Sequence, residues 1–143
     1  MKKEQLTKIL SYSGSIPFLF LTCIVFLKDI HFSAIDISLI LISYGAIILS
    51  FISGMHFAYA ILQDKLSNNL LILSNIVALI SWLCLLINFK LALLVIILGY
   101  IFNLVIDFIS YKNLVFEKWF YNLRLRVSII VISCLILNFW HIS

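Results

Sequence analysis

The chain has 143 residues, of which 64% are hydrophobic and 11% are charged, and its formal net charge is +4. Soluble domains carry about a quarter charged residues, so this composition excludes an ordinary soluble globular protein. The hydrophobic residues come in runs of about twenty, which lets a helix cross a bilayer core of roughly 30 Å. Because a helix satisfies its own backbone hydrogen bonds in lipid, we expect an all-α integral membrane bundle without a separate soluble domain.

Five transmembrane helices are predicted in chain order, and together they make a single transmembrane domain. Gly14 and Pro17 interrupt the first span, and the second is long enough to tilt in the bilayer. The third and fourth spans are separated by only a few residues, which predicts an antiparallel hairpin. The predicted spans are residues 6–27, 35–62, 70–87, 91–109 and 127–140.

Lysine and arginine are distributed unequally between the two sides that five spans define. One side holds eight of them and the other holds only Lys28 and Lys90. The positive-inside rule therefore predicts a cytoplasmic N-terminus and an external C-terminus. Positive charge at span ends touches anionic headgroups, so the basic balance predicts no nucleic-acid partner. The eight are Lys2, Lys3, Lys8, Lys65, Lys112, Lys118, Arg124 and Arg126.

The second span carries small residues at a strict spacing of four: Ala46, Ser50, Gly54 and Ala58. Residues four apart share a helix face, and small side chains let a second backbone approach closely. We interpret this stripe as a packing seam against a neighbouring helix of the bundle, for example the first span, in preference to a ligand groove.

The fourth span places Asn103 and Asp107 on one face, and Asp107 is the carboxylate that lies well inside a predicted span. An acid at membrane depth normally faces the bundle interior and finds a partner. By topology, His56, Trp119 and Arg124 fall in the same cytoplasmic half. We therefore predict a polar cluster of Asp107, Arg124, His56, Asn103 and Trp119, which serves either as a structural ion pair or as a proton or ligand site.

No sequence motif indicates a catalytic residue, a metal or a cofactor. The chain lacks the H-E-x-x-H, P-loop, G-x-S-x-G and glycine-rich dinucleotide patterns. Cys23, Cys84 and Cys134 lie in three different spans with no paired spacing, so we expect free thiols that pack as small hydrophobic groups. His31 and His141 lie at the outer boundary, where nothing supports a metal site.

Several segments together resemble the membrane proteins grouped as domain of unknown function 3429. The resemblance rests on residues 13–18, 44–46, 51–58 and 119–124, together with Trp82 and Asp107. It implies a five-helix membrane protein of unassigned activity, found in proteobacterial membranes and mitochondria. The family pattern favours Gly-Gly-x-Arg-Trp-Gly where this chain has residues 53–58, so His56 stands at a position that is often arginine. The occurrence of the family in proteobacterial membranes, together with the abundance of Ile, Asn and Lys, indicates the cytoplasmic (inner) membrane of a bacterium.

Three functions remain open at this stage. The leading hypothesis is a non-enzymatic structural, assembly or interaction module that contacts the lipid bilayer and another membrane complex or a second copy of itself. The alternative is a small oligomeric transporter or proton-coupled carrier that uses Asp107 and His56. An enzyme acting on a lipid or quinone comes third, because the sequence offers no nucleophile or metal site for it.

The predicted orientation can be tested with reporter fusions. A reporter joined at Ser143 should behave as external, and one inserted near Asn113 should behave as cytoplasmic. Both reporters on the same side of the membrane would mean that the number of spans is wrong.

Overall fold

The computed structural model describes residues 2–27, 34–63 and 68–141. The predictions that involve Lys28, His31 and Lys65 lie outside these residues. Within the described ranges the chain is all-helical, which confirms the expected fold class. The helices are α1 (Lys3–Ser13), α2 (Ile16–Phe26), α3 (Ala34–Leu62), α4 (Asn69–Leu83), α5 (Phe89–Lys112) and α6 (Lys118–His141).

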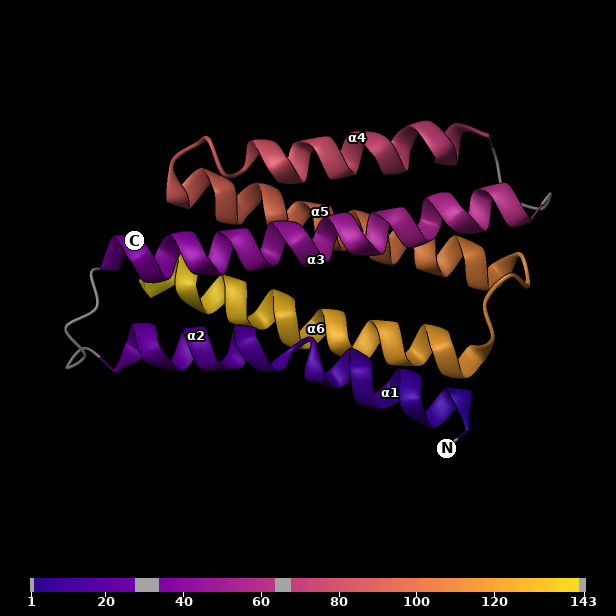
Figure 1. The fold of residues 1–143 in the computed structure, drawn as a ribbon, viewed down its shortest axis with the longest axis horizontal. Coiled ribbons are helices and arrows are strands. Elements are labelled where there is room, and N and C mark those ends of the chain that lie inside the picture. The colour runs from indigo at the N-terminus through magenta and orange to yellow at the C-terminus, as the bar shows by residue number, and fades with distance from the viewer. Residues whose placement is uncertain (1, 28–33, 64–67, 142–143) are drawn as a thin grey trace.

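The helices lie side by side as five rods, with α1 and α2 forming one bent rod (Figure 1). Helix α3 packs against α2, α4 and α5, and helix α6 packs against α1, α2 and α5. The N-terminal and C-terminal ends of the described chain lie at opposite ends of the bundle (Figure 1). Among the described residues, four segments are long and apolar enough to cross a membrane, and the apolar helix α4 is shorter, at 15 residues. The four are Lys3–Phe26, Ile37–Leu62, Phe89–Lys112 and Lys118–His141.

The bend between α1 and α2 follows from Pro17, which lies in the first turn of α2. Proline has no backbone N–H, so a continuous helix would leave a carbonyl of the preceding turn without its partner. The Tyr44 hydroxyl of α3 donates a hydrogen bond of 2.9 Å to the Gly14 carbonyl at the bend. A tyrosine from a second helix thus satisfies a backbone group that the bend frees, as the bilayer requires.

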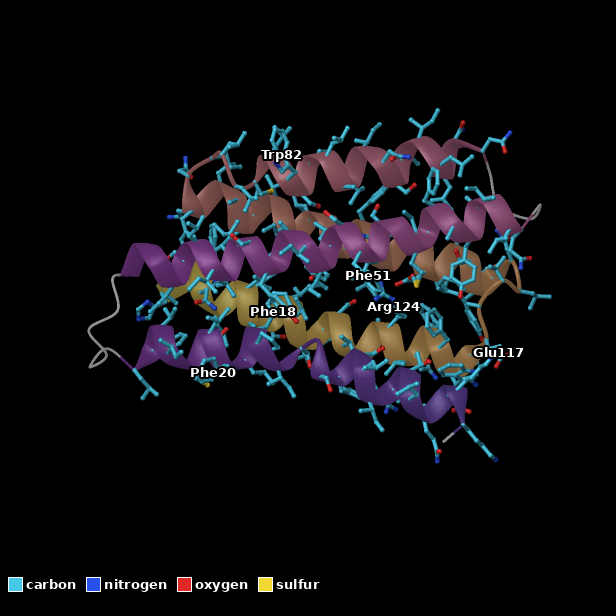
Figure 2. The ribbon with its side chains drawn as sticks, viewed as in Figure 1. Phe18, Phe20, Phe51, Trp82, Glu117 and Arg124 are labelled. Carbon is cyan, nitrogen blue, oxygen red and sulfur yellow. The ribbon has the colours of Figure 1, made fainter. Side chains whose placement is uncertain are left out.

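The bundle exposes many large apolar side chains to its surroundings and buries several polar ones within a mainly apolar core. Trp82 and Phe20 point away from the bundle (Figure 2), and both are largely exposed. Inside, Ser53 of α3 donates to the Ser74 carbonyl of α4, and Asn138 of α6 donates to the Thr22 hydroxyl of α2. Lipid covers the apolar exterior, while hydrogen bonds between helices hold the interior together.

Helices α4, α5 and α6 differ in length from the predicted spans. Helix α6 begins at Lys118, nine residues before residue 127, and carries Arg124 and Arg126 inside the helix. Helix α4 ends at Leu83 and a turn leads into α5, whose first turn is capped by Asn88 accepting from the Leu91 N–H at 2.9 Å. Hydropathy marks the apolar segment, but a helix extends as far as its backbone hydrogen bonds and caps allow.

Within this chain the predicted packing seam on α3 is wrong at Gly54 and Ala58, and Ser50 is partly buried. Ala46 is buried, but Ala58 is exposed, and a Cβ added at Gly54 would have no neighbour within 4 Å. Helix α1, the expected partner, packs against α6 and α2 instead. The reason is that α3 turns its polar residues Ser53 and His56 inward, which places Gly54 on the outer surface.

The closest approach at a glycine occurs instead between α3 and α5. A Cβ at Gly99 would come within 2.5 Å of the Leu49 side chain. We predict that Gly99→Leu lowers the free energy of unfolding by about 1–3 kcal/mol, because overpacking forces neighbouring side chains to move. Thermal unfolding in mild detergent measures this, with Gly54→Leu as the control that should melt like the wild type. Equal melting temperatures would contradict the packing described.

Candidate functional site

The candidate site begins on α5, whose inward face carries its polar residues. The buried positions of α5 recur every three or four residues, as expected for one face of a helix. Tyr100, Asn103, Asp107 and Ser110 all lie on this face. The chain folds α5 into the bundle centre because its polar side chains must face protein, whereas Leu94, Leu98 and Ile101 on the opposite face are exposed and can face lipid.

Asp107 joins three helices through its two carboxylate oxygens. Its Oδ1 lies 2.8 Å from His56 Nε2 on α3, and its Oδ2 accepts a hydrogen bond of 3.2 Å from Arg124 Nε on α6. The Asp107 side chain is fully buried, and the Arg124 side chain is 12% exposed. We call these residues, together with Asn103, the Asp107 cluster. An aspartate and an arginine in contact form a neutral pair, which removes the largest electrostatic penalty of burial.

His56 faces an oxygen atom with each of its ring nitrogens. Its Nδ1 lies 3.0 Å from Asn103 Oδ1, and its Nε2 contacts Asp107. Both nitrogens donate only when the ring carries its second proton. If the Asn103 amide turns over, its NH₂ group faces Nδ1 and suits a neutral ring. The arrangement therefore accommodates either protonation state of His56 with a change of one amide.

Aromatic side chains separate the cluster from the nearer end of the bundle. Phe116, in the connection between α5 and α6, is buried and lies with its ring stacked toward His56 at a centroid distance of 6.5 Å. Tyr59 and Phe120 pack against Phe116 at 4.9 Å and 5.0 Å. This cover keeps the charges in a medium of low dielectric constant, where their attraction is strong.

Trp119 is the predicted member that the structure places elsewhere. Its indole N–H donates to Glu117, and the Lys8 ammonium lies 5.8 Å from its ring. Trp119 thus lines a surface recess of about 350 Å³ between α1 and α6, which Arg126 also borders. Because α6 is helical from Lys118, Trp119 stands more than one turn before Arg124 and on another face.

Tyr100 is a site residue that the sequence reasoning missed. It is 1% exposed, and its hydroxyl has no hydrogen-bond partner. The Nη2 atom of Arg124 is also buried and also lacks a hydrogen-bond partner. Helix periodicity in the sequence could have identified Tyr100, because it lies three residues before Asn103 and seven before Asp107 and so shares their helix face. Tyr111, one turn after Asp107 on α5, stacks on the Tyr121 ring at a centroid distance of 5.0 Å.

The site offers hydrogen-bond donors and acceptors but no metal-ligand set. Within the described residues, no three His, Cys, Asp or Glu side chains come together in a way that could hold a metal ion. Cys84 and Cys134 are buried, and the described cysteines are free thiols.

Comparison with known proteins gives a family. The family model described as Protein of unknown function (DUF3429) matches residues 3–140, which is nearly the whole chain. The chain belongs to this family. No curated protein and no solved structure matches it. In this DUF3429 member, the sequence segments that carry the resemblance all lie within one continuous match. The family description assigns no activity, and so none to the Asp107 cluster.

The Asp107 cluster predicts a strong dependence of stability on Asp107. Asp107→Asn should lower the free energy of unfolding by about 3–5 kcal/mol, because it leaves the Arg124 charge buried without its counter-charge. The double variant Asp107→Asn with Arg124→Gln should recover at least half of this loss, because it removes both charges. Thermal unfolding in detergent measures the effect, and Lys112→Gln, an exposed cation on α5, is the control. An Asp107→Asn protein that melts like the wild type would contradict a structural role.

Proposed function

We propose that this multi-pass membrane protein is a non-enzymatic module that binds another membrane protein and lies in the bacterial inner membrane with its N-terminus in the cytoplasm. The observation that carries the proposal is the Asp107 cluster. Both carboxylate oxygens are engaged by residues of two other helices, and the second ring nitrogen of His56 is engaged by Asn103. Groups occupied in this way favour a rigid scaffold over a reactive centre.

The outer face of α3 supplies the contact surface in this proposal. Ile47, Phe51, Gly54, Ala58 and Ile61 follow each other at spacings of three or four and are all exposed. Small residues on a lipid-facing helix allow a second helix to approach closely, with larger apolar side chains packing around them. His56 on the inward face of α3 binds Asp107 and Asn103 of α5, so that α3 presents its outer face in one orientation.

The distribution of charge supports the orientation. The start of α1, the end of α5 and the start of α6 lie at the same end of the bundle, and the start of α5 lies at the other end (Figure 1). These helix ends carry Lys3, Lys112 and Lys118 on one side and Lys90 on the other. A bias of this kind keeps the basic end on the cytoplasmic side.

The α3 face can be tested without disturbing the fold. Because Gly54 has open space around it, Gly54→Leu should keep the wild-type melting temperature while blocking the approach of a partner helix. We expect a complex that co-purifies with the tagged wild-type protein in mild detergent to fall at least tenfold with Gly54→Leu. Ile61→Leu, on the same face and similar in volume to the wild type, is the matched control.

Two outcomes would contradict this proposal. In one, the wild-type protein purifies from its native membrane without any stoichiometric partner. In the other, a partner is present but Gly54→Leu retains it fully, which would move the contact away from the α3 face.

A proton-coupled carrier is the second candidate, and the geometry of His56 favours it. The ring can hold one or two protons with only a turn of the Asn103 amide, as a proton-transfer site requires. The Asp107→Asn variant separates the two candidates. A carrier predicts that the Asp107→Asn protein folds normally but fails to complement a deletion strain, whereas a scaffold predicts an unstable protein.

A further inference from the structure

A cavity of about 120 Å³ opens beside the Asp107 cluster, between the bend of the first rod, α3 and α6. Arg124 and Tyr100 line it, and Leu10 of α1 and Phe51 of α3 stand among the lining residues. Figure 2 shows Arg124 between α3 and α6, near Phe51. Leu10 and Phe51 are 61% and 73% exposed, so the cavity borders the surface that faces lipid.

Two buried donors in this cavity lack acceptors. The Tyr100 hydroxyl and Arg124 Nη2 have no hydrogen-bond partner, although Arg124 Nε donates to Asp107. A buried donor without an acceptor costs about 1–3 kcal/mol, so native structures seldom leave one unpaired. Both donors belong to residues that line one cavity, so an oxygen acceptor that enters it is the group that would satisfy them.

The charge of the surroundings favours a neutral acceptor. Arg124 and Asp107 already form a neutral pair, so a bound phosphate would add a buried negative charge. The next cations along these helices, Lys8 and Arg126, line the separate surface recess rather than this cavity. A carbonyl oxygen accepts from tyrosine and arginine without introducing a charge.

Depth and size favour a lipid-soluble ring. Tyr100 is near the middle of α5, about 17 Å from either end at 1.5 Å per residue. With the helices across the bilayer, this depth lies within the hydrocarbon core, below the phosphate groups of the lipids. An engineered protein cavity of about 150 Å³ is known to accept benzene. This cavity, of about 120 Å³, therefore holds part of a six-membered ring, and the rest of the ring lies in the mouth toward lipid.

We propose that this cavity binds the ring of a membrane quinone, with Tyr100 and Arg124 donating hydrogen bonds to one ring carbonyl. The isoprenoid tail leaves between Leu10 and Phe51 into the lipid. Binding is the whole of the proposal, and it includes no transfer of electrons. It goes beyond the proposed partner-binding function and uses different residues from those of the α3 face, apart from Phe51 at the cavity mouth.

Photolabelling of the isolated protein tests the proposal. The full-length protein in phosphatidylcholine nanodiscs is labelled with an azido-benzoquinone, with decyl-benzoquinone as competitor, and labelled peptides are mapped by mass spectrometry. We expect saturable labelling on segments that line the cavity. Tyr100→Phe should weaken competition about tenfold, the loss of a hydrogen bond to a buried donor. Ser128→Leu, which fills the cavity from α6, should abolish saturable labelling.

Folding and specificity are checked separately. Tyr100→Phe should keep or raise the melting temperature without ligand, because it removes an unpartnered buried hydroxyl. Tyr59→Phe, which alters a tyrosine outside the cavity, should leave labelling unchanged. Since no partner protein is present, failure of the partner-binding proposal does not affect this result.

Three results would overturn the quinone site. The first is labelling that neither Tyr100→Phe nor Ser128→Leu alters. The second is the absence of saturable labelling, which would mean that water alone satisfies the two donors. The third is a phospholipid that stays bound in native mass spectrometry of the wild type and is lost with Ser128→Leu, which would identify a different occupant.

Discussion

The carboxylate of Asp107 is the group around which this bundle is arranged. It lies within the apolar part of the chain, where a charge is unfavourable unless it is paired, and it is paired with two helices at once through His56 and Arg124. The rotation of α3, α5 and α6 about their own axes must therefore bring these three side chains together. The inward position of Ser53 and the outward position of Gly54 both follow from that constraint on α3.

The same constraint determines which surfaces are left for other molecules. With His56 turned inward, the small residues of α3 that a helix partner would use lie on the lipid-facing side. With Arg124 held through its Nε, its Nη2 is left without an acceptor in the cavity next to Tyr100. The proposed scaffold role and the proposed quinone site thus both depend on one buried cluster, although each is tested by its own variant.

The bend of the first rod leaves room for the cavity. Pro17 ends the continuous helix, and Tyr44 ties the bend to α3 through the Gly14 carbonyl. Beyond the bend, α1 packs against α6 and not against α3, so a space is left between α1 and α3. That space contains the cavity. A straight helix in place of α1 and α2 would follow α3 more closely and would narrow the opening toward lipid.

The sequence by itself determined the all-helical membrane fold and the family, and it placed His56 and Arg124 in the same half of the membrane as Asp107. These follow from hydropathy and from the few residues that lipid tolerates poorly, because a chain with one acid deep in a span has few ways to neutralise it. Only the tertiary structure decided that Gly54 faces outward, that Trp119 lies apart and that Tyr100 has no acceptor. Small and aromatic residues are compatible with lipid and with protein alike, so their direction depends on how neighbouring helices pack rather than on their own chemistry.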